Sequence, residues 1–142
     1  MHPDKDIPIT LISKIREKAN RFLISELKNH NMAGLAPSHG DILWALFKHG
    51  ALSMKGLAEL IDRDKSTVTV LVNKLILLGY VRKEPDFADS RVTLISLTDE
   101  GRGLKDDLIE ISQKLISKVY KTLSEDERVS LIGLLKKVND NW

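Results

Sequence analysis

The sequence contains no cysteine, and this absence excludes several kinds of chemistry. Without a thiol there are no disulfides, no thiolate nucleophiles and none of the common cysteine-based zinc sites. A long hydrophobic run is also missing, because the densest apolar run, Leu75–Leu78, is far shorter than the roughly 18–20 residues that span a bilayer. We therefore expect a cytoplasmic protein without a membrane partner.

An excess of one charge is missing as well. The chain has 142 residues, and its 22 basic and 20 acidic residues leave a net charge of +2, which excludes a polybasic tail protein and a disordered polyelectrolyte. Neither a Gly-rich phosphate loop nor a nucleophile elbow is present. We therefore expect neither an enzyme nor a cofactor.

The four histidines do not form a metal-binding motif in the sequence. Their spacings match no compact ligand pattern, and we expect no acidic partner at helical spacing, so the sequence predicts no metal site. The residues concerned are His2, His30, His39 and His49.

Apolar residues recur with a helical period over most of the chain and with a shorter period in one segment. Glycines and prolines separate these segments. The pattern predicts a helix from about residue 9 to Asn29, a second from Pro37 to Gly50, and two short helices after Ser53 and Asp64. Two strands are then predicted, at Tyr80–Lys83 and Arg91–Leu97. A long helix should follow from Thr98, with its apolar stripe from Leu104 to Leu123, and a last helix should begin at the capping box Ser124–Glu127.

A tight pair of short helices followed by a β-hairpin is the layout of a winged helix-turn-helix. Strands are expected nowhere else, so the fold class is mainly α with a small β-hairpin wing. We expect a single domain over residues 1–142, with a winged helix-turn-helix lobe at about 36–97. Helices at about 8–31 and 98–142 would flank it as N- and C-terminal dimerisation helices.

The second short helix carries the candidate DNA contacts, since the second helix of such a pair enters the major groove. Its first residues are small hydroxyl or cationic donors at a helix N-terminus, which favours anions. Alternatively, the hydroxyls only cap the helix and the lysine is solvated. The candidates are Lys65, Ser66, Thr67 and Thr69, with Asn73 and Lys74 further along.

The hairpin adds one cation in a defined position. Asp89, two residues before Arg91, can hold the guanidinium through paired hydrogen bonds. An arginine aimed in this way at a wing tip suits a narrow minor groove, where the potential is most negative. Alternatively, the pair is a surface salt bridge worth well under about 1 kcal/mol.

Two stretches resemble the MarR (multiple antibiotic resistance regulator) family. Residues 89–101, Asp-Ser-Arg-Val-Thr-Leu-Ile-Ser-Leu-Thr-Asp-Glu-Gly, are similar to its wing signature of Asp-x-Arg, an alternating strand and Leu-Thr-x-x-Gly. Residues 66–81 resemble its recognition helix and the exit into the wing. The resemblance implies a homodimeric transcription regulator, which we expect to be a repressor, on a pseudo-palindromic double-stranded DNA operator.

The resemblance also implies residue roles. Arg91 would enter the minor groove with support from Asp89, and Ser66, Thr67 and Thr69 would contact the major groove. One departure concerns Val70, where many members carry a basic residue, so the bidentate guanine contact is absent here. Val70 then touches a thymine methyl group, or specificity rests more on the wing and on DNA shape.

The apolar stripes of the first helix and the last two helices are longer than a small lobe can cover. Such a stripe usually marks an interface, and interdigitated terminal helices of two copies would bury it. Alternatively, a helical hairpin folds back on its own domain.

A small aromatic or phenolic effector is a further expectation. His39 in the first turn of the second helix, together with Trp44, would line its pocket, since aromatic walls with one polar group suit an aromatic acid. Alternatively, Trp44 is a core residue and His39 a surface or interface residue. Two other functions stay open, a winged-helix module that binds protein instead of DNA and a regulator without an effector.

Overall fold

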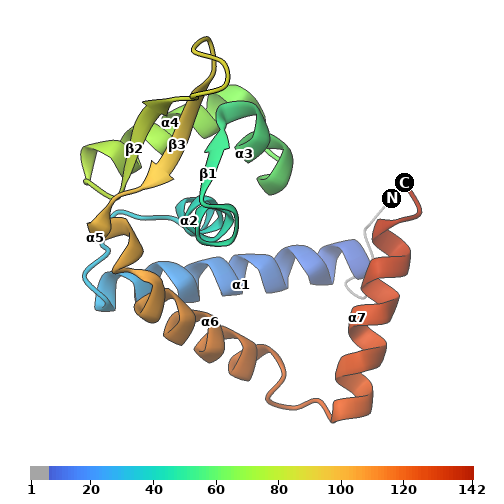
Figure 1. Cartoon of the computed structure of the whole chain (residues 1–142). Coiled ribbons are helices and arrows are strands. Elements are labelled where there is room, and N and C mark those ends of the chain that lie inside the picture. The colour runs from blue at the N-terminus through green and yellow to red at the C-terminus, as the bar shows by residue number, and fades with distance from the viewer. Residues whose placement is uncertain (1–6) are drawn as a thin grey trace. The chain divides into compact units, whose positions relative to one another are not determined.

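The computed structural model describes residues 7–142, and the chain divides into two compact units, residues 1–111 and 112–142. The first unit holds most of the elements, and α6 begins in it and ends in the second (Figure 1). In chain order the elements are α1 (Pro8–Asn29), α2 (Pro37–His49), β1 (Ala51–Ser53), α3 (Met54–Ile61), α4 (Lys65–Leu77), β2 (Val81–Pro85), β3 (Thr93–Leu97), α5 (Asp99–Arg102), α6 (Lys105–Val119) and α7 (Glu125–Asn139). This order confirms the mainly α class with a small wing. Within residues 7–142, no helix is both long and apolar enough to cross a membrane.

Short polar side chains fix where several helices begin. The predicted caps Ser53, Thr98 and Ser124 each accept a hydrogen bond from a backbone N–H in the first turn of α3, α5 and α7. Pro37 lies at the start of α2, as predicted, because the missing N–H of a first-turn proline is not needed there. These caps satisfy backbone donors that have no partner within the helix.

The sheet has three antiparallel strands in the order β1-β3-β2, so the expectation of a hairpin alone was incomplete. Ala51–Ser53 pairs with β3, with Leu52 opposite Ile95. Three residues are too few to show an alternating pattern, and the strand forms because β3 offers it a pairing edge. Pro85 belongs to β2, which is an edge strand, where a residue without an N–H is tolerated.

The long helix predicted after Thr98 is wrong in its extent. It is broken into α5 and α6 at Gly103 and Leu104, and α6 ends at Val119, so Leu123 lies outside it. The apolar period continues through the break because Leu104 still packs against the core. The apolar period of the sequence therefore predicted correctly that Leu104 is packed against the core, but it predicted incorrectly that the helix is continuous.

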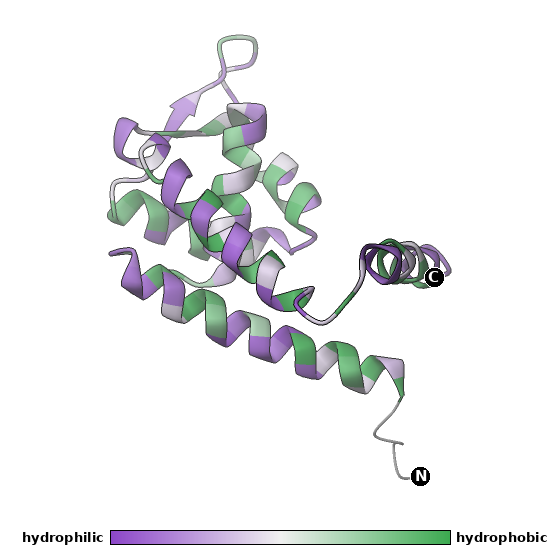
Figure 2. Ribbon diagram, turned by 90° about the horizontal axis from the view of Figure 1, so that it is seen from below, coloured by the Kyte–Doolittle hydropathy of each residue, from purple (hydrophilic) through white to green (hydrophobic). Residues whose placement is uncertain are grey.

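The hydrophobic core of the first unit lies among α2, α3, α4 and the sheet. Its fully buried members come from all of these elements, and α1 adds Leu27 and α6 adds Leu108 and Ile111. Along α1, hydrophobic and hydrophilic residues alternate over the whole helix (Figure 2). Ile12 and Ile15 on this helix are exposed. The central core members are Ile42, Leu43, Leu46, Leu57, Val68, Val72, Leu75 and Ile95.

Candidate nucleic-acid interface

Helix α4 divides into an inner face and an outer face. Val68, Val72 and Leu75 are completely buried, and Leu71 and Ile76 pack partly against the same core. Among the predicted contacts, Lys65, Ser66, Asn73 and Lys74 are exposed and Thr67 and Thr69 are partly exposed. Val70 is 70% exposed, on the outer face. From Lys65 to Lys74 the helix therefore presents a row of exposed or partly exposed polar groups that Val70 interrupts.

Asp64 organises the start of α4. Its Oδ1 accepts hydrogen bonds from the Thr67 backbone N–H and the Ser66 hydroxyl, both at 2.7 Å. These bonds, first of all that from the Thr67 N–H, lower the pKa of Asp64 to about 2. The Thr69 hydroxyl donates to the Lys65 carbonyl at 2.9 Å. The hydroxyls of Ser66 and Thr69 thus have partners within the helix, and they must rotate to donate to a ligand.

Lys74 differs from the other predicted contacts. Its Nζ donates a hydrogen bond to the Gly34 carbonyl, in the connection between α1 and α2. The ammonium group therefore joins α4 to this connection. Asn73, next to it in sequence, is exposed.

The connection between β2 and β3 holds Arg91 in the geometry predicted from the Asp-x-Arg spacing. Arg91 Nε donates to Asp89 Oδ1 at 3.0 Å, and its Nη2 donates to Asp89 Oδ2 at 3.2 Å. The Arg91 backbone N–H also donates to Asp89 Oδ1. The arginine lowers the pKa of Asp89, while its own side chain stays 89% exposed. A positive charge is thereby held in one direction and left open to solvent.

The same loop exposes Phe87 completely, a residue that the sequence analysis did not single out. Internal hydrogen bonds order this tip: the Asp86 N–H donates to the Val92 carbonyl, and the Asp86 carboxylate accepts from the Ala88 N–H. The sequence signal that could have pointed to Phe87 is an aromatic residue in a turn that is mostly polar. An ordered loop thus presents a ring and a guanidinium together.

The wing is fixed to the end of α4 by the Leu-Thr-x-x-Gly segment. The Thr98 backbone N–H donates to the Tyr80 carbonyl, and its hydroxyl donates to the Gly79 carbonyl. Gly101 packs so closely on Tyr80 that a Cβ atom at this position would overlap the Tyr80 carbonyl oxygen. These contacts explain why the motif requires a threonine and a glycine three residues apart.

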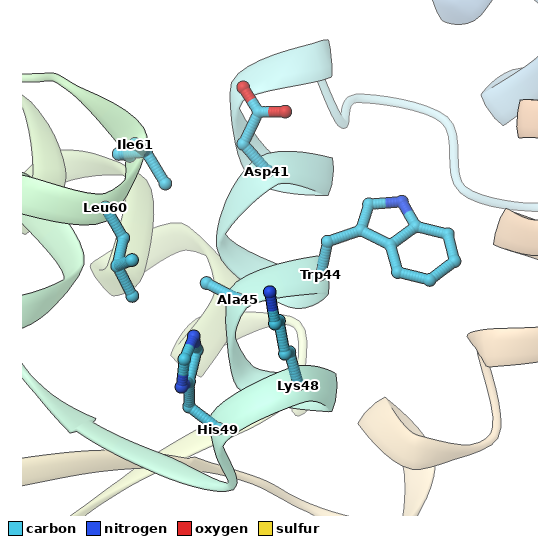
Figure 3. Close-up of a pocket in the computed structure, with 7 residues that line it drawn as sticks. All are labelled: Asp41, Trp44, Ala45, Lys48, His49, Leu60 and Ile61. Atoms are coloured by element: carbon cyan, nitrogen blue, oxygen red, sulfur yellow. The ribbon is translucent and has the colours of Figure 1, made fainter.

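Trp44 and His39 are not brought together in one pocket. Trp44 lines a cavity of about 440 Å³ between α2 and α3 (Figure 3), with Asp41, Ala45, Lys48, His49, Leu60 and Ile61. His39 is buried elsewhere, and its Nδ1 accepts a hydrogen bond from the Ala36 N–H at 2.8 Å. Burial and the charge of Lys74 lower the pKa of His39. Lys48 and His49, which the sequence did not single out, also line this cavity as basic groups.

The expectation that no histidine has an acidic partner at helical spacing was wrong. His30 follows Glu26 by four residues, and its Nε2 lies 3.7 Å from Glu26 Oε2. Its Nδ1 lies 2.9 Å from Asp107 Oδ1, a partner 77 residues away that no local pattern could reveal.

Comparisons with known proteins agree with this fold. A MarR family model matches residues 33–91. The HTH-type regulator YwaE of Bacillus subtilis is 31% identical over 137 residues, covering 94% of this chain and 78% of that protein. The HTH-type repressor NicR of Pseudomonas putida is 30% identical over 99 residues, covering 70% and 63% of the two chains.

Two solved structures have the same architecture. The structure of a MarR mutant from E. coli complexed with operator DNA has a TM-score of 0.81 and 25% identity, covering 90% of each chain. BpsR of Bordetella bronchiseptica, whose DNA binding is described as regulated by 6-hydroxynicotinic acid, has a TM-score of 0.87 and 21% identity, covering 100% of this chain and 99% of that one. YwaE matches nearly the whole length of this chain, and the architecture is that of a winged helix-turn-helix. The chain therefore belongs to the MarR family of DNA-binding transcriptional regulators.

Proposed function

We propose that this regulator is a homodimeric repressor that reads a pseudo-palindromic operator with α4 and the wing. The observation that carries the proposal is the Arg91 guanidinium, held bidentately by Asp89 and left 89% exposed. In the proposed complex this side chain enters the minor groove beside each half-site. Asp89 acts as its support and touches no DNA.

In the proposed complex α4 lies in the major groove. Lys65 and the hydroxyls of Ser66 and Thr67 reach phosphates or base edges, and Thr69 and Asn73 lie one turn and two turns further along the helix. Val70 contacts a thymine methyl group, since a valine side chain offers no hydrogen bond. Lys74 is the weakest of the predicted contacts, because the Gly34 carbonyl already holds its ammonium group.

The proposed dimer rests on apolar residues that are exposed on α7. On α7 and its C-terminal end, exposed apolar residues stand three, four, seven and eleven residues after Leu131, which places them on one helix face. We propose that residues 8–31 and 98–142 form the dimer contacts. A two-fold axis would then place two α4 helices about 34 Å apart, one turn of DNA. The apolar residues of the α7 stripe are Leu131, Leu134, Leu135, Val138 and Trp142.

The effector we propose is a small aromatic acid at the cavity beside Trp44. Trp44 is an aromatic residue at its lining, Leu60 and Ile61 are apolar ones, and Lys48 and His49 supply basic groups for a carboxylate. His39 would act only indirectly, because it does not line this cavity. Binding would favour dimers whose α4 spacing no longer matches the operator, so the repressor would be released. The repressor name of NicR and the ligand-regulated DNA binding of BpsR support this direction.

A salt titration tests the DNA-binding function, on a duplex whose operator sequence is first obtained by selecting bound oligonucleotides from a random pool. A protein with several phosphate contacts should lose affinity with a slope of about −0.9 per contact in a plot of log K against log salt. A winged-helix module that binds protein should instead show little affinity for DNA at any salt concentration. Repeating the titration with an aromatic acid distinguishes a regulated repressor from one without an effector.

A further inference from the structure

We propose that His30, Asp107 and Glu110 form a binding site for a divalent transition-metal ion, which goes beyond the proposed function. The site lies where α1 ends and α6 begins. His30 is the C-cap residue directly after α1, and the two acidic residues lie in the first two turns of α6. The three side chains offer ligand atoms that all lie within 4.8 Å of one another. They come from two helices of the same compact unit.

The spacing of the first pair suits a shared ion. His30 Nδ1 and Asp107 Oδ1 are 2.9 Å apart. Two ligands held at about 2.1 Å from one ion are about 3.0 Å apart in octahedral geometry and about 3.4 Å apart in tetrahedral geometry. The pair is therefore already at the separation of neighbouring ligands. The imidazole is 12% exposed, so little ordering of the ring is left for binding.

Glu26 completes the arrangement from the other side of the ring. A neutral imidazole has one N–H and one lone pair, yet carboxylates face both nitrogens of His30, Asp107 at Nδ1 and Glu26 at Nε2. A metal ion on Nδ1 and a proton on Nε2 would satisfy both carboxylates. Hydrogen bonding from the second nitrogen of a metal-bound histidine to a carboxylate is the usual way of orienting such a ligand.

The donor set indicates the class of ion. One imidazole nitrogen and two carboxylate oxygens suit Zn²⁺ or Mn²⁺, whereas Mg²⁺ and Ca²⁺ prefer oxygen ligands alone. The bound ion would join the end of α1 to α6. Binding should therefore raise the melting temperature of the folded chain. The residues are too far apart in sequence to form a ligand motif, which is why the histidine spacings predicted no site.

Isothermal titration of the full chain, stripped with a chelator, tests the site with ZnCl₂, MnCl₂ and MgCl₂ as separate probes. We expect saturable one-to-one binding of Zn²⁺ or Mn²⁺ in the micromolar range or tighter, and no comparable binding of Mg²⁺. His30→Ala and Asp107→Asn should each weaken binding at least tenfold, and Glu26→Gln about tenfold. His49→Ala is the matched control, because this exposed histidine lies on α2, outside the cluster, and it should leave the affinity unchanged.

Absence of Zn²⁺ and Mn²⁺ binding by the parent chain at micromolar concentrations would overturn the site. So would His30→Ala binding as tightly as the parent. If the circular dichroism spectrum of His30→Ala shows that the helices have unfolded, the test rests on Asp107→Asn, because asparagine has nearly the same shape as aspartate. Unchanged affinity and an unchanged metal-induced rise in melting temperature in Asp107→Asn would then refute the proposal. None of these measurements involves DNA, so their outcome is independent of operator binding.

Discussion

Helices α4 and α7 are of similar length and both have N-caps, yet only α4 has residues buried in a hydrophobic core. Three residues of α4 are completely buried within the first unit. No residue of α7, which the structure describes in full, is buried, and Leu134 and Val138 are 60% and 51% exposed. Burial in the core of the first unit thus accounts for the apolar residues on the inner face of α4, whereas burial does not account for the apolar residues of α7.

Local signals are too weak to account for α7 alone. Ser124 and Glu127 form a reciprocal capping box, but an isolated helix of 15 residues is marginal in water even with good propensities. Most helical stability in proteins comes from packing of an apolar face. The exposed stripe of α7 therefore needs a partner surface, which a second copy of the chain would supply.

The largest effect should come from placing charge in the α7 stripe. The double variant Leu134→Glu and Val138→Glu would bury two carboxylates in the proposed dimer interface, so we expect monomers and a loss of operator affinity of more than 100-fold. Light scattering and a DNA-binding assay measure the two effects. In a chain that is naturally monomeric, the same residues would stay exposed and neither quantity would change.

Lys137→Glu is the matched control for this variant. It introduces a carboxylate on the same helix, at an exposed position outside the apolar stripe. We expect it to remain a dimer. Monomers in the control would show that charge on α7 in general, and not the stripe, determines assembly.

A second contrast uses one glycine from each region. Gly101→Ala should destabilise the lobe by about 3 kcal/mol, because its Cβ would overlap the Tyr80 carbonyl, part of the backbone, and force the wing away from α5. Gly133→Ala meets no atom within 4 Å and should stabilise α7 slightly through helix propensity. Urea unfolding of both variants measures the difference. Equal midpoints would contradict the close packing at the base of the wing.

The same contrast separates what could be predicted from the sequence from what could not. Helix starts were predictable where the cause is local, as at Ser53 and Ser124, whose hydroxyls bond to N–H groups three residues on. The break between α5 and α6 was not, because apolar residues continue through it. Strand β1 was missed because only pairing with β3 defines it.

The candidate interface shows the same division. The Asp89–Arg91 bonds span two residues and were predictable from spacing and side-chain chemistry. The bond from Lys74 to Gly34 spans 40 residues, and the contact between His30 and Asp107 spans 77. Neither has a local signature. Sequence therefore indicated which residues present charge within one loop, but not which are drawn into contacts between elements.

Arg91→Ala tests the lobe as the source of DNA affinity. We expect operator binding to weaken by about 2 kcal/mol and the preference at flanking A·T positions to relax, without a change in stability. Lys55→Ala is the control, since Lys55 is also an exposed cation but lies on α3, outside the predicted DNA contacts and the proposed dimer contacts. Fluorescence anisotropy with operator variants gives both affinities. Equal losses in the two variants would indicate a general effect of charge.

Acidification should weaken the lobe through His39. Its pKa is lowered in the folded state, first by burial and then by Lys74, so below about pH 6.5 the unfolded chain binds the proton more readily. Stability is then lost as the pH falls from 6.5 toward the lowered folded-state pKa. His39→Gln should remove this part of the pH dependence, measured as urea midpoints between pH 7.5 and 5. His49→Gln, at an exposed position, should not.

The smallest effect we predict concerns the ring at the wing tip. Phe87 is fully exposed in the loop that also holds Arg91, so it contributes no packing to the lobe and would be available to DNA in the proposed complex. Phe87→Ala should weaken operator binding by about 1 kcal/mol, the low end for an aromatic contact with nucleic acid, and leave the urea midpoint unchanged. Phe87→Trp should retain the affinity. If Phe87→Ala binds the operator as tightly as the parent, the wing reads DNA through its guanidinium alone.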